Sequence, residues 1–550
     1  AVSRSRGGRG RVFAVYAVLL VATAFVFSSV PRGFIPTQDK LYLIAGVLLV
    51  TGLLAVPLAV RGDNDLFLPA TGELSPATSR PPALRSRPVV INWNALEPGV
   101  PELRLNLFED ITLDAVRERV ERPPAGGYVW VGRLTDDRGG RVSLSVRDGV
   151  VAGTVYRSGR EWATIRYAGE GQTHVIDEVD PAAPEPGGPD HIAPTLPQPT
   201  ESQSPAASAC QEDGSVIDVM VAYTAQARDA SGGQAAIEAL IAQRIADMNS
   251  ANYDSAAVFQ WRLVATLDVG YAESGNIYDD LQRLQMPDDG QMDEVHLVRN
   301  AVMADLVALL IAQGSNSACG YAYQMNTLGS WFEGYGFGVT ALDYPGDYTC
   351  GALTLAHELG HNLGNAHDRA HTSGSVLFPF SYGFQSPSQT FRDIMSYDCP
   401  NGCPRINRWA NPDVWYLGEP TGVEFETDPA NAADIVRSMH SARQVAANFR
   451  ANCVEETATP LPPPTDTPTH TPLPPATPTT TPTSPPSPTV TSSPTLRPSA
   501  TPTGTVPTSA PTATLRPTRR PTTPPYPTQT PRPTATPPVR FFFAPAIIRK

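Results

Sequence analysis

Large apolar side chains are nearly absent between Pro460 and Pro538, in a chain of 550 residues. Of the 57 prolines, 27 fall in this stretch, interspersed with threonine. Such a segment cannot bury enough surface to offset the entropy cost of folding. We therefore expect a disordered Thr/Pro stalk at residues 457–539. An apolar segment follows at residues 540–550, and its role as a wall-attachment signal or a docked strand stays open.

Lysine is nearly absent and occurs only at Lys40 and Lys550. Residues 1–61 carry a net +6 and residues 457–550 a net +7, so the total of −13 leaves −26 on residues 62–456. A protein that binds nucleic acid needs a basic face to meet the phosphates. The acidic middle of the chain therefore excludes nucleic acid as a partner.

Cysteine is absent before residue 210, and all six cysteines lie in one segment of the chain. An even number in a chain with an export signal indicates three disulfides and an oxidising compartment. The sequence does not determine the pairing, and we expect Cys399–Cys403 across a Pro-Asn-Gly turn, Cys319–Cys350 and Cys210–Cys453. A zinc knuckle built on Cys399 and Cys403 is the alternative, but no second closely spaced Cys/His pair accompanies it.

The N-terminal part of the chain has the pattern of a membrane anchor or signal region, at residues 1–61. An uncharged run at Val12–Val30 follows four arginines, and a second apolar run covers Leu41–Val60. The first run is long enough to span a bilayer, and its basic flank predicts a cytoplasmic N-terminus. We expect everything after about residue 62 to be exported, to the cell surface or the extracellular space. Two spans would return the chain to the cytoplasm, so the number of spans stays open.

Residues 12–47 also resemble a fragment of the resistance-nodulation-division efflux pumps. The resemblance rests on VPRGFIPTQDKLYLIAGV, from Val30 to Val47. In those pumps, Leu41–Val47 would be a soluble strand rather than a span. A spliced or fragmentary N-terminus is therefore the alternative to a two-span anchor.

A small antiparallel β domain is expected at residues 88–180. Alternating apolar and polar residues predict strands at residues 102–108, 127–134, 141–157 and 161–168, with a hairpin turn at Asp148-Gly149. Residues 181–208 then form a Pro-rich, exposed linker that is open to proteolysis. The domain is either an ordinary accessory domain or a propeptide that keeps the next domain inactive until the linker is cut. Since no cysteine precedes Cys210, a propeptide thiolate cannot block a metal here.

Strands and helices alternate in residues 209–453, which predicts an α/β domain. Strands are expected at residues 216–224, 259–269, 306–312 and 335–342, and helices at residues 235–251 and 295–304. The first helix places Ile237, Leu240, Ile241 and Ile245 on one apolar stripe.

The segment TLAHELGHNLGNAHD, from Thr354 to Asp368, contains the residues that predict chemistry. On a helix, His357 and His361 share a face and can hold one Zn²⁺, with Glu358 placed as general base. Gly364 can adopt a positive φ and end the helix, which brings His367 round as third ligand. Three protein ligands leave the fourth position to water, as in catalytic rather than structural zinc sites.

A second motif, FRDIMSYD at Phe391–Asp398, follows the first. The two motifs together resemble those of the metzincin zinc peptidases, in which Met395 would form an apolar floor beneath the metal ligands. Asp368 resembles the reprolysin or adamalysin branch, whereas Met395-Ser396-Tyr397 resembles the astacin and serralysin branches. The resemblance covers about Ser215–Cys453, and the β domain has the position of that family's propeptide.

The resemblance implies a metzincin-type α/β domain with a mixed sheet and an active-site helix, acting on protein or peptide substrates. Substrate would lie along an edge strand near Met325–Trp331, and residues after Met395 would wall the pocket beside the scissile bond. Tyr397 is either an oxyanion stabiliser, a fifth ligand or a wall residue. A Ca²⁺ ion is possible in such a domain but unsupported by the sequence, and we expect a monomer.

The sequence therefore predicts an exported zinc metalloendopeptidase made as a zymogen. The alternative is a surface binding or adhesion module on a peptidase scaffold, but such a scaffold has no need of Glu358.

Overall fold

The computed structural model describes residues 64–70, 83–169, 171–181, 183, 185–195, 211–345 and 350–451. The expected membrane segment, the efflux-pump resemblance, the Thr/Pro stalk, the C-terminal segment and the Cys210–Cys453 pair lie outside these ranges. Within the ranges, helices of sufficient length and apolarity to cross a membrane are absent.

The first part of the fold is a nine-stranded antiparallel sheet in the order β1-β2-β9-β8-β7-β6-β5-β4-β3. Its strands are β1 (Phe67–Pro69), β2 (Ala83–Ile91), β3 (Glu102–Phe108), β4 (Ile111–Glu121), β5 (Tyr128–Leu134), β6 (Arg141–Arg147), β7 (Val150–Arg157), β8 (Arg160–Tyr167) and β9 (Thr173–Val179). Asp148 and Gly149 form the predicted turn with φ of +46° and +81°. The sheet begins before residue 88, because β1 and most of β2 precede the alternation that is visible in the sequence.

This sheet curls until its two edges meet. The backbone N–H of Leu66, next to β1, donates a hydrogen bond of 3.1 Å to the carbonyl of Arg104 in β3. One face encloses a core of its own, which includes Leu105, Trp130 and Leu144. The alternation of ELRLNLF in β3 accounts for this core, because every second side chain points inward.

The second part is a mixed six-stranded sheet in the order β10-β14-β15-β13-β11-β12. Its strands are β10 (His191–Ile192), β11 (Val216–Thr224), β12 (Gln260–Val269), β13 (Leu306–Gln313), β14 (Gly320–Tyr323) and β15 (Phe337–Asp343). Strands β11, β12, β13 and β15 run parallel, and β14 is antiparallel to β15. The continuous apolar runs of β11 and β13 fit strands that are covered on both faces.

Helices and a small hairpin complete the α/β domain. They are α3 (Ala225–Ala230), α4 (Gln234–Asp254), α5 (Ile277–Gln285), α6 (Asp293–Ala301), the 3-10 helix η2 (Ser330–Tyr335), α7 (Thr354–Asn362), α8 (Ile435–Ala446) and the strands β16 (Trp415–Tyr416) and β17 (Glu419–Pro420). The predicted fold class, a β domain followed by an α/β domain with an active-site helix, is confirmed. The strand predicted from residue 335 starts at Phe337, because Tyr335 ends the 3-10 helix.

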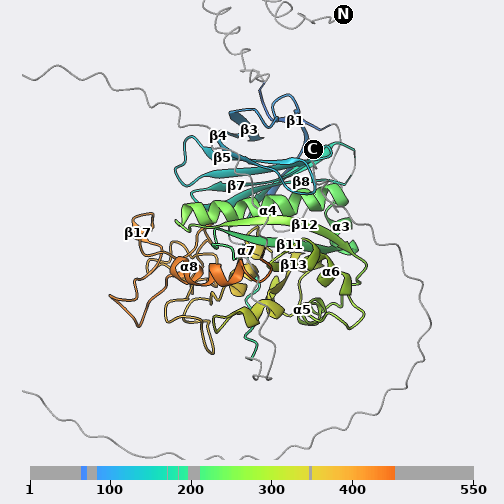
Figure 1. Ribbon diagram of the computed structural model, residues 1–550. Coiled ribbons are helices and arrows are strands. Elements are labelled where there is room, and N and C mark those ends of the chain that lie inside the picture. The colour runs from blue at the N-terminus through green and yellow to red at the C-terminus, as the bar shows by residue number, and fades with distance from the viewer. Residues whose placement is uncertain are drawn as a thin grey trace, which may run out of the picture. The chain divides into compact units, whose positions relative to one another are not determined.

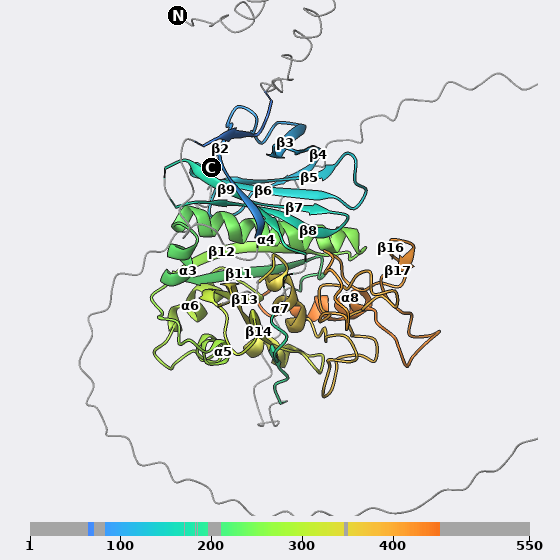
Figure 2. The same cartoon turned by 180° about the vertical axis from the view of Figure 1, so that it is seen from behind.

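Helix α4 lies between the two sheets, as both views show (Figure 1, Figure 2). Its predicted stripe contributes Ile237, Ile241 and Ile245 to the core of the α/β domain. The opposite side is buried as well and is polar, because it faces β6 and β7 of the first sheet. Asp247 there accepts hydrogen bonds from Ser143 at 2.6 Å and from the Tyr156 hydroxyl at 2.9 Å.

Candidate active site and metal centre

Helix α7 carries the first two histidines of the predicted motif. His357 and His361 lie one helical turn apart on the same face, and both are buried. The helix ends at Asn362, and Gly364 follows with a φ of +83°. A β-carbon on Gly364 would lie 2.3 Å from Leu377, so both the conformation and the space require glycine. The turn reverses the chain and returns His367 to the face of α7.

The three histidines converge through their Nε2 atoms. Nε2 of His357 lies 3.2 Å from that of His367 and 3.2 Å from that of His361. Nδ1 of His357 is 2.9 Å from the carbonyl of Ile394, and Nδ1 of His361 is 2.8 Å from the carbonyl of Asn365. Because these carbonyls only accept hydrogen bonds, each Nδ1 carries the proton and each Nε2 presents a lone pair. Lone pairs that face one another at this distance fit a shared cation.

Burial supports neutral ligands at this centre. It lowers the pKa of His357, of His367 and of His361, the last to about 4. Neutral imidazole is the form that coordinates a metal. The donor set of three imidazole nitrogens therefore fits Zn²⁺, which prefers nitrogen and sulfur donors in tetrahedral sites.

The fourth donor at this centre is Asp190. Its carboxylate oxygens lie 2.9 Å from Nε2 of His367, 3.2 Å from Nε2 of His357 and 3.6 Å from Nε2 of His361. The ligand atoms of all four residues lie within 4.8 Å of one another. The Asp190 carboxylate and the three imidazole nitrogens therefore form one donor set for a shared cation.

Asp190 belongs to the segment that the sequence predicts to be an exposed linker, but Asp190 itself is buried and the next two residues form strand β10. Strand β10 pairs in parallel with β14, where His191 lies opposite Ala322. The N–H of Ala322 donates to the carbonyl of Asp190 at 2.9 Å, and the N–H of Gln324 donates to that of Ile192 at 2.7 Å. An Asp-His pair in an otherwise Pro- and Gly-rich stretch is the one signal in the sequence that this segment binds something.

The exposed edge of the sheet also differs from the prediction. Residues 325–331 form no strand but lead into the 3-10 helix η2, and the edge is made by the two-residue strand β10, which covers β14. Strand β14 precedes the predicted region, and Cys319, just before it, is tied to Cys350 at the approach to α7. The strand that runs beside the three histidines is therefore Gly320–Tyr323.

Glu358 is buried beside the centre, and its Oε2 has no hydrogen-bond partner among the described residues. Burial, reinforced by the charge of Asp190, raises the pKa of Glu358 well above its usual range. Gly320 makes room for it, since a β-carbon at Gly320 would lie 2.1 Å from its Oε1. A buried carboxyl with a free oxygen next to three metal-binding imidazoles is placed to exchange a proton with a water or a substrate there.

Met395 lies fully buried beneath α7. A β-carbon on Gly360, within the helix, would lie 2.7 Å from its sulfur, so the glycine allows the close approach. The turn around Met395 is held by Asp393, whose Oδ1 accepts hydrogen bonds from the Ser396 N–H at 3.0 Å and hydroxyl at 2.6 Å. The FRDIMSYD motif does not itself show that the packing of Met395 depends on Gly360.

Tyr397 and Asp368 lie on the far side of His367. The Tyr397 ring centroid is 4.3 Å from that of His367, and its hydroxyl lies 2.6 Å from the carbonyl of Gly188 and 3.1 Å from Oδ2 of Asp190. Oδ2 of Asp368 accepts a hydrogen bond of 3.1 Å from the N–H of Tyr397. The structure thus places the Tyr397 ring and hydroxyl beside the metal centre, and Asp368 against the backbone of Tyr397.

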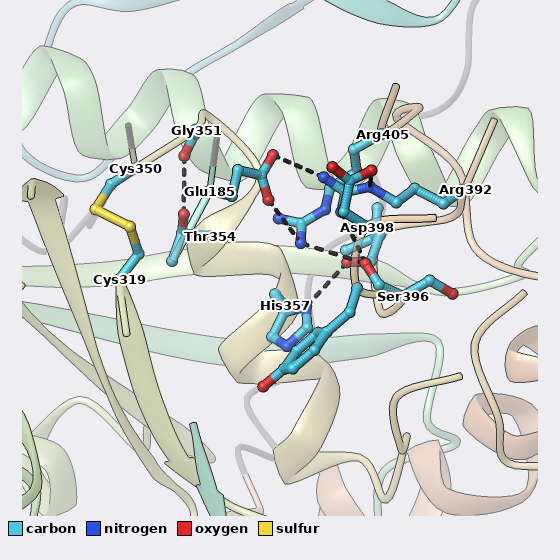
Figure 3. A network of polar contacts seen from close by, with 12 residues as sticks. Glu185, Cys319, Cys350, Gly351, Thr354, His357, Arg392, Ser396, Asp398 and Arg405 are labelled. Atoms are coloured by element: carbon cyan, nitrogen blue, oxygen red, sulfur yellow. Dashed lines mark hydrogen bonds and ion pairs between the residues drawn. A yellow bond between two sulfur atoms is a disulfide. The ribbon is translucent and has the colours of Figure 1, made fainter. Parts of the chain in front are cut away.

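A second carboxylate, the partly buried Glu185, lies on the same segment as Asp190 and was not anticipated from the sequence. It forms ion pairs with Arg392 at 3.1 Å and with Arg405 at 2.9 Å. Figure 3 shows both guanidinium groups turned toward Glu185, near the N-terminal end of α7. The two arginines outweigh burial and lower the pKa of Glu185 to about 2.

Two of the three expected disulfides are confirmed, Cys319–Cys350 and Cys399–Cys403. The second pair excludes the zinc-knuckle alternative, because both sulfurs are already bonded to each other.

An α/β domain whose active-site helix carries two histidines and a buried glutamate, with a third histidine beyond a glycine turn, defines a zinc metallopeptidase. Residues 213–410 match the model of the reprolysin-type metallopeptidase family M12. A peptidyl-Asp metalloendopeptidase of Xanthomonas campestris pv. campestris is 30% identical over 399 residues, which cover 69% of this chain and 90% of that protein. A peptidyl-Asp metalloendopeptidase of Stenotrophomonas maltophilia is 30% identical over 380 residues, covering 66% and 86%.

This chain therefore belongs to the reprolysin-like metallopeptidases of family M12, and it is a zinc metalloendopeptidase. The predicted resemblance to the metzincins of the reprolysin branch is confirmed.

Proposed function

We propose that this chain is an exported zinc metalloendopeptidase that is made as a zymogen, is kept latent by Asp190 and cleaves proteins next to aspartate. The observation that carries the proposal is the position of Asp190 on the three histidines, at the end of a segment that leads from the β domain. The two relatives that are 30% identical to this chain are named peptidyl-Asp metalloendopeptidases, which supports the preference for aspartate.

In the active enzyme, His357, His361 and His367 would hold Zn²⁺. The metal, when bound, polarises the scissile carbonyl and lowers the pKa of a water molecule. Glu358 accepts the proton of the attacking water at its free Oε2 and passes it to the leaving amine. The Tyr397 hydroxyl, which here bonds to Gly188 and Asp190, becomes free to donate a hydrogen bond to the substrate carbonyl.

The proposed latency follows from the positions that residues 185–192 occupy in the site. Asp190 takes the position beside the histidines that a water needs, and it holds the Tyr397 hydroxyl. Strand β10 takes the edge of β14, along which an extended substrate would add as a further strand. Removal of residues 185–192 would therefore free the water position, the hydroxyl and the edge strand together.

The contact between the β domain and α4 supports detachment of that domain. It includes many charged and polar pairs, such as Arg141 with Asp254 at 2.6 Å and Arg147 with Glu238 at 2.6 Å. Polar side chains of this kind can be rehydrated, so exposing this side of α4 to water costs less than exposing an apolar face. A polar composition therefore suits an interface that has to separate when the zymogen is processed.

Export is supported by the two disulfides of the α/β domain, because such bonds persist in oxidising compartments. Anchoring through the N-terminal apolar region is part of the same proposal, and it lies outside the described residues.

The full-length chain tests the proposal when it is secreted from a bacterial host and assayed on casein with and without a zinc chelator. We expect activity that appears on processing and that the chelator abolishes. N-terminal sequencing should place the mature N-terminus between residues 193 and 211, since a cut before residue 185 would leave the segment in the site. Casein hydrolysis that is insensitive to the chelator, or an intact chain as active as the processed one, would contradict the proposal.

A further inference from the structure

We propose that Arg405, oriented by Arg392, recognises the acidic side chain of the substrate beside the scissile bond, and that Glu185 occupies this subsite in the latent chain. The inference rests on the proposed function and adds the residues that read the substrate. Two carboxylates of one segment would then block two distinct parts of the site: Asp190 the metal centre and Glu185 the specificity subsite.

The subsite lies directly beside the catalytic residues. Arg405, Glu185, His357, Glu358 and Tyr397 all line one small cavity of about 30 Å³. Arg405 and Glu185 also line a larger cavity of about 710 Å³, which extends between α4 and the sheet of the β domain. Removal of the β domain and its segment would join these spaces into a cleft that leads to the metal centre.

The charges at this place require an anion. The side chain of Arg392 is 4% exposed and that of Arg405 is 14% exposed, and Glu185 pairs with both. Arg392 also has Asp398 at 3.7 Å, whereas Glu185 is the one carboxylate partner of Arg405 among the described residues. A buried charge that loses its partner is strongly unfavourable. Once Glu185 leaves, an acidic side chain of the substrate is the natural replacement.

Arg405 and Arg392 have different parts in this arrangement. Arg392 is anchored from within, because it donates to the carbonyl of Ser396 at 2.8 Å and to that of Cys403 at 3.1 Å. Apart from its ion pair with Glu185, the Arg405 side chain makes one long contact, of 3.4 Å, to the Ser396 carbonyl, and its Nε has no partner among the described residues. Arg405 therefore keeps donors for a ligand, whereas Arg392 is a positioning residue that holds the loop and adds positive charge.

The spacing of the segment fits a ligand that spans both places. Glu185 and Asp190 are separated by Pro-Gly-Gly-Pro, and the N–H of Gly188 is fixed by a 2.7 Å hydrogen bond to the carbonyl of Ser317. The two prolines restrict the free segment, which reduces the entropy cost of binding. The segment that places Asp190 at the metal centre thus also holds the carboxylate of Glu185 beside it.

Paired peptides test the subsite. The zinc-loaded processed enzyme would be given two quenched fluorescent peptides that differ only by aspartate or asparagine at the cleavage site. The enzymes are the wild type, R405M, R405K and the matched control R437M, whose arginine pairs with Glu426 at the surface. The readout is the ratio of kcat/KM for the aspartate peptide to that for the asparagine peptide.

We expect the wild type and R437M to favour aspartate by roughly ten- to a hundredfold, the value of a charge-assisted hydrogen bond. R405M should bring the ratio close to one, and R405K should recover part of it because it keeps the charge but not the fork of donors. An unchanged ratio in R405M, or a wild type that cleaves without regard to the acid, would overturn the inference. Both of these outcomes require an active peptidase, so they are distinct from failure of the proposed function, which is loss of all chelator-sensitive cleavage.

A synthetic peptide of residues 183–195 gives a second test that does not depend on the folding of the β domain. We expect the peptide to inhibit the wild-type enzyme, and E185Q in the peptide to weaken inhibition by roughly ten- to a hundredfold. The same peptide change should have little further effect on R405M, because the partner is already missing. An equal loss of inhibition on both enzymes would show that Glu185 does not act through Arg405.

Discussion

Oδ1 of Asp190 lies 2.9 Å from Nε2 of His367, the third histidine of the metal centre. The two residues come from opposite sides of the α/β domain in sequence, since Asp190 precedes its first long strand and His367 follows the active-site helix. The contact joins the catalytic motif to the upstream domain. The residue that we propose keeps the chain latent therefore lies in the same cluster as the three histidines.

Glu358 is expected to serve the chemical step rather than metal binding. E358A should keep one zinc per chain and lose peptidase activity by roughly a hundredfold to ten-thousandfold, the usual value of a general base. E333Q is a matched control, because Glu333 pairs with Arg450 at the surface. Zinc content by elemental analysis and kcat on a peptide substrate measure the two effects, and wild-type turnover in E358A would rule the role out.

Gly360 is expected to be needed for the packing of Met395 under the metal centre. G360A places a methyl group 2.7 Å from the methionine sulfur. Overpacking of this kind costs about 1–3 kcal/mol, which exceeds the gain of about 1 kcal/mol in helix propensity. G334A is the control, since nothing lies within 4 Å of a β-carbon there. Urea unfolding should show a lower midpoint for G360A only, and equal midpoints would contradict the packing argument.

Docking of the β domain on α4 should weaken as the pH rises to about 7. Burial is the main cause that raises the pKa of Asp247 from 3.8 to about 7, against hydrogen bonds from Ser143 and Tyr156 and the charge of Arg244, while Glu161 adds to the rise. In the docked state Asp247 holds a proton that it releases when α4 is exposed, so docking takes up a proton between pH 3.8 and about pH 7. The affinity of the β domain for the α/β domain is then highest below about pH 4, falls by up to roughly tenfold per pH unit, and levels off above pH 7.

This pH dependence can be measured on a zymogen whose linker has been cut. Gel filtration from pH 4 to pH 8 would follow the fraction of β domain that remains associated with the α/β domain. D247N should remove much of the pH dependence, because the amide resembles the protonated carboxyl in shape and charge. A slope of the same size in D247N would assign the proton uptake to another group.

The two disulfides should differ in their contribution to stability. Cys319–Cys350 closes a loop of 31 residues and Cys399–Cys403 one of 4. The chain-entropy relation gives about 4 kcal/mol for the long loop and about 2 kcal/mol for the short one. Paired serine variants, unfolded in urea, should reproduce this order. The long-loop variant should also lose activity, since this bond ties β14 to the start of α7, and a reversed order would contradict the entropic explanation.

The parts of the site that are local in sequence could be predicted. His357, Glu358 and His361 share a helix turn, and Gly364 reverses the chain toward His367, so spacing alone brings the ligands together. The strands of the α/β domain could also be predicted from local sequence, because their long apolar runs reflect burial on both faces.

The contacts of the upstream segment could not be predicted, because they join residues that are far apart in a stretch with the composition of a linker. Asp190 and Glu185 stand among proline and glycine, and apart from the adjacent Asp190-His191 pair the local sequence does not indicate that three histidines and two arginines bind them. The second buried side of α4 was missed for a related reason. Gln243, Asp247 and Ser250 look like a solvated face in sequence, and only the β domain buries them.

The central claim, that Asp190 keeps a zinc peptidase latent, is tested most directly by the initial rate of peptide cleavage by the intact, unprocessed chain. Wild type, D190N and the control D136N, which alters an exposed aspartate of the β domain, would be compared before any processing is visible on a gel. The account predicts that intact D190N cleaves the peptide in a chelator-sensitive way, while intact wild type and D136N do not. Intact wild type as active as the processed enzyme, or intact D190N as inactive as wild type, would contradict it.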